Sequence, residues 1–258
     1  MTLFAEVRHP SSAKAPLVLL HGFGGIGALW APVIDRLDDD QPLIIYDLPG
    51  HGGSLDADGV GHAGVMAKVI LADLNRRGLS SFHLCGHSMG GAVASLVALR
   101  TATRVRSLTL LAPGGFGFEI DHLALRRYAV AAEVGELATA LAVMTAPGHV
   151  AERSGLERLA ATRQAPGAVD RLLAILASFL VERDGRTGQG TLPLAPLDGL
   201  GVSTRLLWGT ADPILPVSQA ENIWPKSEVT LIEGAGHILI EEARDQAAAA
   251  LNAALAEG

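Results

Sequence analysis

A serine flanked by glycines, between a short apolar run and a long one, constrains the fold of this chain more than any other feature. Residues 82–85 (Phe-His-Leu-Cys) are typical of a buried strand, and residues 92–99 (Ala-Val-Ala-Ser-Leu-Val-Ala-Leu) are typical of a helix. The segment Gly-His-Ser-Met-Gly-Gly at 86–91 joins them and matches the pattern G-x-S-x-G. The pattern is informative because a strand precedes it and a helix follows it.

This turn predicts a specific role for Ser88. A serine that attacks a carbonyl carbon must project from a sharp, strained turn, where the residues two before and two after it can carry almost no side chain. Gly86 and Gly90 meet that need. The start of the following helix directs free N–H groups to the same place. We therefore predict Ser88 to be a nucleophile and the Met89 N–H to be one oxyanion donor. The structural alternative is a glycine-rich turn in which Ser88 only caps the helix.

The composition limits the partners that we expect. Apolar residues make up 49% of the 258 residues, and the formal net charge of −7 argues against a nucleic acid or an anionic membrane as partner. Cys85 is the only cysteine, which excludes an intrachain disulfide and a cysteine cluster for a metal. The first nine residues lack the basic start and apolar stretch of a secretory signal, and no apolar run reaches the ~20 residues of a membrane helix. We expect a cytoplasmic protein.

Strand-like and helix-like segments alternate through most of the chain. Strands are predicted at residues 17–20, 43–46, 82–85 and 105–111, with an edge strand at 2–7, and helices at 30–37, 63–76 and from 90 onward. Further strands at 203–208 and 228–232 precede a closing helix at 242–255. This alternation predicts an α/β fold with a doubly wound, mostly parallel sheet.

The alternation stops between residues 116 and 196. This segment shows no strand-like run, and its helical patterns lie at 123–133, 136–144, 156–162 and 168–180. We interpret it as a helical cap that is inserted over the carboxyl edge of the sheet. The predicted division is therefore a core of residues 1–115 and 197–258, with a cap of residues 116–196.

Two residues that follow later strands complete a reactive set with Ser88. Asp212 comes after the strand ending at Trp208, and His237 after the strand ending at Ile232. Both lie at the carboxyl ends of predicted parallel strands, where open α/β sheets place ligands. A nucleophilic serine needs a base, and the base needs an orienting carboxylate, so we predict His237 as the base and Asp212 as its partner. The other eight histidines are weaker candidates, and those in the glycine-rich turns at 21 and 51 favour a structural role.

The loop at residues 21–25 (His-Gly-Phe-Gly-Gly) permits two interpretations. It follows the first core strand, where a second oxyanion donor is expected, and the Phe23 N–H suits that role. It also begins a G-x-G-x-x-G pattern at residues 22–27, and Asp47 lies 20 residues after Gly27. This is the spacing of a dinucleotide-binding site. The dinucleotide alternative leaves the serine, aspartate and histidine without a role. We therefore predict no cofactor and no metal.

Five motifs resemble those of the α/β-hydrolase superfamily and occur in that superfamily's order. They are His21-Gly-Phe-Gly-Gly25, Asp47-Leu-Pro-Gly-His-Gly-Gly-Ser54, Gly86-His-Ser-Met-Gly-Gly91, Trp208-Gly-Thr-Ala-Asp-Pro213 and Gly234-Ala-Gly-His237. The resemblance implies an eight-stranded, mostly parallel sheet with a helical cap, and acyl transfer to Ser88 and then to water without a metal. More narrowly, residues 111–120 and the cap resemble the hydrolase-like domain of acetoin dehydrogenase dihydrolipoamide acetyltransferases and free-standing relatives. No Asp-Lys-Ala lipoylation motif occurs in the chain.

These observations predict a serine hydrolase that cleaves a small carboxylic ester or thioester through Ser88, His237 and Asp212. The alternative is carbon–carbon bond hydrolysis of a vinylogous diketone, of the meta-cleavage-product type, with the same three residues. A hydrolase fold that only binds a partner or ligand is a third hypothesis, which the three reactive residues disfavour. We expect a monomer or homodimer whose partner is a small-molecule substrate.

Overall fold

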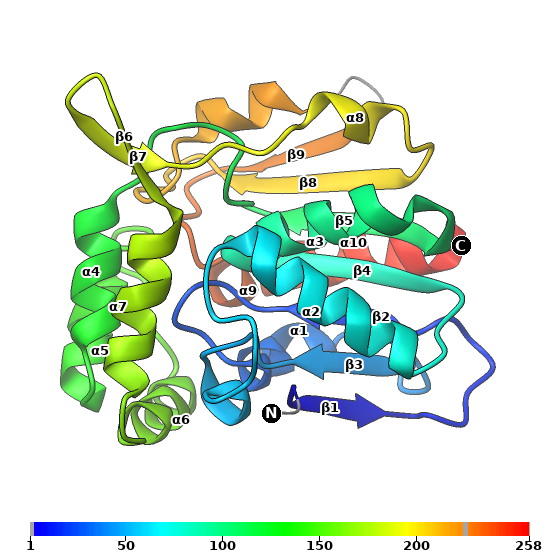
Figure 1. Cartoon of the computed structure of the whole chain (residues 1–258), viewed down its shortest axis with the longest axis horizontal. Coiled ribbons are helices and arrows are strands. Elements are labelled where there is room, and N and C mark those ends of the chain that lie inside the picture. The colour runs from blue at the N-terminus through cyan, green and yellow to red at the C-terminus, as the bar shows by residue number, and fades with distance from the viewer. Residues whose placement is uncertain (1–2, 224–226, 258) are drawn as a thin grey trace.

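The computed structural model describes residues 3–223 and 227–257, which form a central sheet with helices on both faces (Figure 1). The sheet runs in the order β1-β3-β2-β4-β5-β8-β9. Its strands are β1 Ala5–Arg8, β2 Leu17–Leu20, β3 Leu43–Tyr46, β4 Phe82–His87, β5 Val105–Leu111, β8 Ser203–Gly209 and β9 Glu228–Ile232. Neighbouring strands are parallel except for β1 and β3. The predicted doubly wound, mostly parallel sheet is confirmed, but the described residues contribute seven strands to it, not the eight that the resemblance implied.

The central strands are buried on both faces, which explains their continuous apolar sequences. Every residue of β2, β3 and β4 is buried. In Figure 1, α2 and α3 lie in front of the sheet, and α1 and α10 lie behind it. These flanking elements are α1 Ala31–Ile34, α2 Ala63–Arg76, α3 Met89–Thr101, α9 Leu239–Glu242 and α10 Arg244–Glu257, with short 3-10 turns η1 Gly27–Trp30, η2 Gly52–Ser54, η3 Ala102–Arg104 and η4 Val217–Asn222.

The chain leaves the sheet after β5 and returns in the neighbouring strand β8. Between these strands lie α4 His122–Val130, α5 Val134–Ala142, α6 Arg153–Arg163, α7 Ala168–Phe179, β6 Leu180–Arg183, β7 Arg186–Gln189 and α8 Ala195–Asp198. Figure 1 shows α4 to α7 beside the sheet at the end where the parallel strands terminate. The four predicted helices of this segment are therefore present at the carboxyl edge. The division into core and cap at residues 116 and 196 stays a prediction.

One expectation for this segment was wrong, because β6 and β7 form an antiparallel hairpin where no strand was predicted. The hairpin turns at Asp184 and Gly185, whose φ angles are 51° and 71°, and two positive φ values suit a tight two-residue hairpin turn. Residues 181–183 and Arg186 are exposed, and β7 contains no apolar side chain, although Gly188 and Gln189 are buried. Strands with so few apolar side chains lack the apolar alternation from which strands are predicted.

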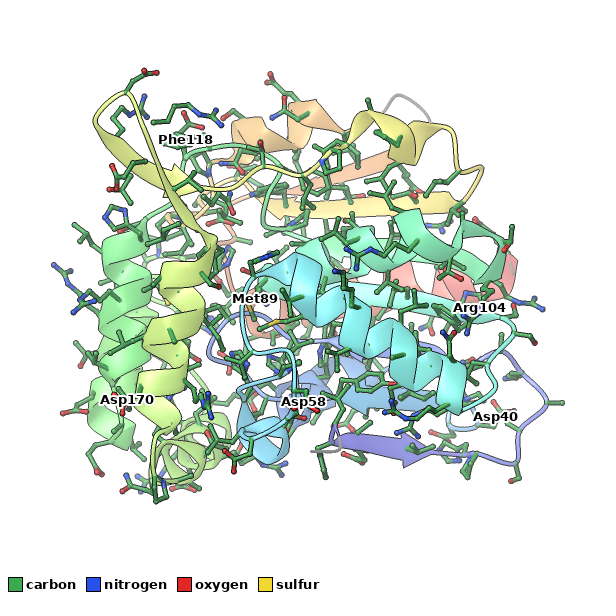
Figure 2. The ribbon with its side chains drawn as sticks, viewed as in Figure 1. Asp40, Asp58, Met89, Arg104, Phe118 and Asp170 are labelled. Carbon is green, nitrogen blue, oxygen red and sulfur yellow. The ribbon has the colours of Figure 1, made fainter. Side chains whose placement is uncertain are left out.

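Most charged side chains lie at the periphery, whereas the turn at Ser88 lies inside. Figure 2 shows Met89 near the middle of the view, whereas Asp40 and Asp170 are at the edges.

Within residues 3–223 and 227–257, no helix combines the length and the apolar character needed to cross a membrane.

Candidate active site

Ser88 occupies a strained turn between β4 and α3. Its φ and ψ angles are 52° and −119°, a backbone conformation that a residue with a side chain rarely adopts. A methyl group added at Gly86 would lie 2.2 Å from the Gly90 carbonyl oxygen, and one added at Gly90 would lie 2.3 Å from the Leu20 carbonyl oxygen. Both glycines are therefore required sterically, and the turn has the form that the sequence indicated.

The structure brings Ser88, His237 and Asp212 together. The distance from His237 Nε2 to Ser88 Oγ is 2.9 Å, and the distance from His237 Nδ1 to an Asp212 carboxylate oxygen is 2.8 Å. The side chains of His237 and Asp212 are 1% and 0% exposed. Since the carboxylate accepts the Nδ1 proton, Nε2 is free to accept the serine proton. The arrangement can move a proton from the hydroxyl to the imidazole.

Backbone N–H groups hold the Asp212 carboxylate in place. Its second oxygen accepts hydrogen bonds from the N–H groups of Ile214 and Leu215, at 2.8 and 2.9 Å. The buried aspartate is thus oriented toward His237 before any substrate arrives.

Groups that the sequence analysis missed hold the backbone around His237. The N–H groups of Gly236 and Ile238 both donate to the Glu242 carboxylate at 2.8 Å, and the His237 N–H donates to the Met144 carbonyl at 3.0 Å. Glu242 also accepts a hydrogen bond from the Ala146 N–H at 2.7 Å. One carboxylate therefore fixes both neighbours of the histidine and joins them to the inserted segment. Nothing in the sequence distinguishes Glu242 from the glutamate beside it.

The loop at residues 21–25 lies directly beside the nucleophile. A methyl group added at Gly22 would lie 3.2 Å from Ser88 Cβ. Met89 is the first residue of α3, so its N–H has no intrahelical partner. Phe23 and Ser88 line the same two cavities. The two residues predicted as oxyanion donors thus lie on elements that meet at the serine, and their catalytic role stays a proposal.

The histidines at 21 and 51 hold the neighbouring loops. His21 Nε2 accepts a hydrogen bond from the Leu48 N–H at 2.9 Å, and its Nδ1 donates to the Gly22 carbonyl at 2.7 Å. His51 Nε2 accepts from the Gly24 N–H at 3.1 Å. Burial lowers the pKa of both rings, which favours the neutral forms that these bonds require. The structure agrees with their predicted structural role.

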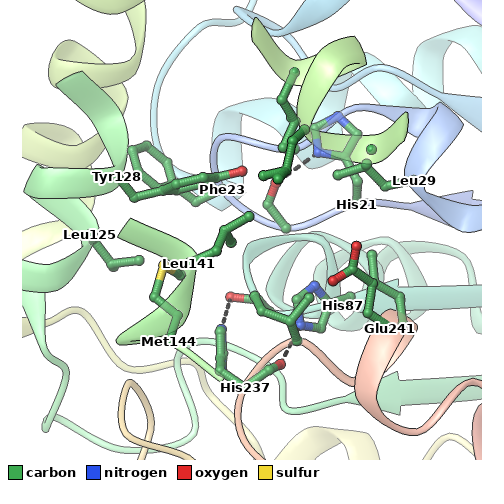
Figure 3. A pocket seen from close by; sticks show the side chains of 18 residues that line it. His21, Phe23, Leu29, His87, Leu125, Tyr128, Leu141, Met144, His237 and Glu241 are labelled. Carbon is green, nitrogen blue, oxygen red and sulfur yellow. Dashed lines mark hydrogen bonds between the residues drawn. The ribbon is translucent and has the colours of Figure 1, made fainter. Parts of the chain in front are cut away.

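Two cavities meet at Ser88. The smaller has a volume of about 40 Å³ and reaches His237, Tyr128 and Glu241 (Figure 3). The larger has a volume of about 320 Å³ and extends between α3 and the β6–β7 hairpin, along Leu96 and Phe179. Most of the lining side chains are apolar, as in sites for small organic ligands.

Asp47 does not support the dinucleotide alternative. Its two carboxylate oxygens accept hydrogen bonds from the N–H groups of Gly27 and Gly53, at 2.6 and 2.8 Å. The side chain that would bind a ribose is therefore buried and joins two loops. Among the residues that the structure describes, no three His, Cys, Asp or Glu side chains are grouped so that they could hold a metal ion.

The sequence model of the alpha/beta hydrolase fold family matches residues 15–243. The chain belongs to this family. The expectations of the fold and of a hydrolase enzyme are therefore confirmed at the level of the α/β hydrolases.

The proteins that this α/β hydrolase resembles are named for several different activities. It is 34% identical over 231 residues to a dihydrolipoyllysine-residue acetyltransferase component of an acetoin cleaving system from Pseudomonas putida, a match that covers 90% of this chain and 60% of that protein. It is 27% identical over 245 residues to a monoacylglycerol lipase of Bos taurus, with 89% and 72% covered. A solved meta-cleavage product hydrolase from Pseudomonas fluorescens shares 18% identity with a TM-score of 0.79, over 99% of this chain and 94% of that one. The last likeness shows the fold alone.

Proposed function

We propose that this chain is a serine hydrolase that cleaves a small carboxylic ester or thioester. The observation that carries the proposal is the chain of hydrogen bonds from Ser88 Oγ through His237 to Asp212, at 2.9 and 2.8 Å. The strained turn at Ser88 and the two mainly apolar cavities that Ser88 lines support the same function.

The proposed reaction has two steps. Ser88 Oγ attacks the carbonyl carbon while His237 Nε2 takes the hydroxyl proton, and Asp212 stabilises the imidazolium that forms. The N–H groups of Phe23 and Met89 would stabilise the negative charge that develops on the carbonyl oxygen. The imidazolium then protonates the departing oxygen or sulfur, which leaves an acyl group on Ser88. His237 next activates a water molecule, which releases the acid and restores the hydroxyl.

The test replaces the proposed nucleophile and a matched serine. Ser88→Ala should lower kcat for p-nitrophenyl butyrate by at least about 1,000-fold, because the covalent step is lost. Ser95→Ala is the control: Ser95 is buried on the same helix, and its hydroxyl donates to the Gly91 carbonyl. A fluorophosphonate should label the wild type at Ser88, as mass spectrometry would show. Full activity of the Ser88→Ala variant would refute the proposal.

A substrate screen distinguishes the esters from the alternative. The cavity of about 320 Å³ supports an acyl group of several carbons, so we expect kcat/KM to rise from p-nitrophenyl acetate toward medium-chain esters. The acetyltransferase names of the relatives support adding an S-acetyl thioester to the screen. Carbon–carbon bond hydrolysis stays the alternative. High activity on a ring-cleavage diketone together with negligible activity on every ester and thioester would favour it.

A further inference from the structure

Arg163, the last residue of α6, is a buried cation. It is 7% exposed, and burial lowers its pKa, yet a guanidinium remains protonated in proteins. No ion pair joins it to a carboxylate within the described part of the chain, and its Nε atom is buried without a hydrogen-bond partner there. An unpaired buried charge costs stability that an apolar side chain of the same size would not. This cost calls for a functional explanation.

The guanidinium and a tyrosine converge on one carbonyl of the loop beside Ser88. Arg163 Nη2 donates to the Gly24 carbonyl oxygen at 2.9 Å, and the Tyr128 hydroxyl donates to the same oxygen at 3.2 Å. The Arg163 Cζ atom lies 5.3 Å from the centre of the Tyr128 ring, in a cation–π contact. In Figure 3, Tyr128 and Phe23 lie at the top of the cavity, and His237 lies at the bottom. Both donors come from the segment inserted between β5 and β8.

From that carbonyl, two peptide groups lead to the proposed oxyanion donor. The Gly24 carbonyl shares a peptide group with the Gly25 N–H, which donates to the Gly22 carbonyl at 3.1 Å. The Gly22 carbonyl shares a peptide group with the Phe23 N–H. It accepts a second hydrogen bond from His21 Nδ1 at 2.7 Å. Each hydrogen bond to a carbonyl polarises the peptide and makes its N–H a stronger donor.

We propose that Arg163 and Tyr128 are positioning residues for the oxyanion site and act on the Phe23 N–H through the peptides after Gly24 and Gly22. This inference rests on the proposed function, since it needs an oxyanion to stabilise. Docking of α4 and α6 against the loop at 21–25 would then complete the site. Because the charge on the oxygen is largest in the tetrahedral state, Arg163 should affect kcat more than KM.

The experiment compares variants that remove or keep the charge. Arg163→Met retains much of the volume without the charge and the donors, and Arg163→Lys retains the charge. Tyr128→Phe removes the second donor. The control is Arg158→Met, since Arg158 is exposed on the same helix. Activity is measured with p-nitrophenyl butyrate, together with the Ki of a trifluoromethyl ketone, which forms a tetrahedral oxyanion with a nucleophilic serine, and of the matching methyl ketone.

Loss of polarisation weakens the Phe23 N–H as a donor but does not remove it, so the loss should be smaller than that of a deleted oxyanion donor. We therefore expect Arg163→Met to lower kcat by about 3- to 10-fold, with KM changed less than about 2-fold. The Ki of the trifluoromethyl ketone should rise by a similar factor, while that of the methyl ketone stays constant. Arg163→Lys should recover part of the loss, Tyr128→Phe should show a smaller loss, and Arg158→Met should show none.

Other outcomes would overturn the proposal. The first is a folded Arg163→Met variant whose kcat and Ki are unchanged. The second is an equal loss of activity in Arg163→Met and Arg163→Lys, with a lower melting temperature in both, which would indicate a purely structural role. Fluorophosphonate labelling of the wild type keeps the two proposals apart. If the wild type is labelled at Ser88 and Arg163→Met is fully active, only the role of Arg163 fails; if the wild type is neither labelled nor active, the proposed function fails.

Discussion

His87 Nε2 donates a hydrogen bond to the backbone carbonyl of His237 at 2.8 Å, although His87 ends β4 and His237 lies in the loop after β9. Their rings pack with centroids 5.1 Å apart. The residue before the proposed nucleophile thus holds the backbone of the proposed base, independently of the bond between the reactive side chains. The histidine next to Ser88 has a structural partner and does not compete with His237 for the hydroxyl.

His87→Gln should weaken the pH dependence of stability. Burial lowers the pKa of His87 to about 3, with the neighbouring His237 adding to the effect, whereas the unfolded chain has a histidine pKa near ~6.5. The folded state therefore excludes a proton that the unfolded state binds, so its full stability is present above ~6.5 and is lost as the pH falls toward ~3. The slope from this one group is at most about 1.4 kcal/mol per pH unit. Glutamine cannot titrate but can still donate to the carbonyl.

Urea unfolding of both proteins at pH 7, 6 and 5 measures this difference. The exposed His9→Gln is the control and should match the wild-type slope. We expect kcat of His87→Gln to stay within about 3-fold of the wild type because the donor is retained. Parallel stability curves for His87→Gln and the wild type would show that this ring does not bear on the acid sensitivity of the fold.

Glu242→Ala should lower both stability and activity. Its carboxylate accepts hydrogen bonds from the N–H groups of Gly236, Ile238 and Ala146, at 2.8, 2.8 and 2.7 Å. Hydrogen bonds to a charged group contribute about 1.5–3 kcal/mol each, but released N–H groups can bind water, so we expect a total loss of about 3 kcal/mol. Since the histidine loop is also released, kcat should fall by about 10-fold.

Denaturant titration and ester kinetics measure these two effects. Glu233→Gln serves as the control because Glu233 is exposed on the same loop. Glu242→Gln should be intermediate, since the amide keeps one acceptor oxygen and directs a donor toward an N–H group. A Glu242→Ala variant that retains both the wild-type unfolding free energy and kcat would exclude the positioning role of this carboxylate.

Two glycine-to-alanine changes should have opposite effects. At Gly90, an added methyl group would lie 2.3 Å from the Leu20 carbonyl oxygen and 2.5 Å from that of His21, which forces backbone to move. We expect Gly90→Ala to be expressed as insoluble protein or to lose several kcal/mol. Gly135 is an exposed residue in the first turn of α5, and a methyl group added there meets nothing within 4 Å. Alanine should therefore stabilise the helix by up to about 1 kcal/mol.

Thermal melting of the two alanine variants tests the strain argument. A soluble Gly90→Ala with a wild-type melting temperature would mean that the turn at Ser88 tolerates a side chain at that position. Such a result would remove the steric reason for the G-x-S-x-G pattern in this chain.

Elements with a periodic apolar pattern were predictable, and those without one were not. The helix predicted at 63–76 is α2 with the same bounds, because its apolar positions recur on one face. The β6–β7 hairpin was missed because its strands carry few apolar side chains and no apolar alternation. Asp212, the carboxylate of the reactive set, could be predicted because it follows a recognisable strand, as Ser88 and His237 do.

The sequence by itself determined the turn at Ser88, since a strand and a helix joined within one short segment need the sharp turn that glycines at 86 and 90 permit and larger residues would block. It also determined which strands precede the loops that carry Asp212 and His237. Only the tertiary structure decided the roles of Glu242 and Arg163. Glu242 binds the N–H of Ala146, 96 residues away, and Arg163 binds the carbonyl of Gly24, 139 residues away, in segments brought together by the docking of the inserted helices. A backbone N–H or carbonyl is present at nearly every residue, so no sequence pattern marks the one that a distant side chain will bind.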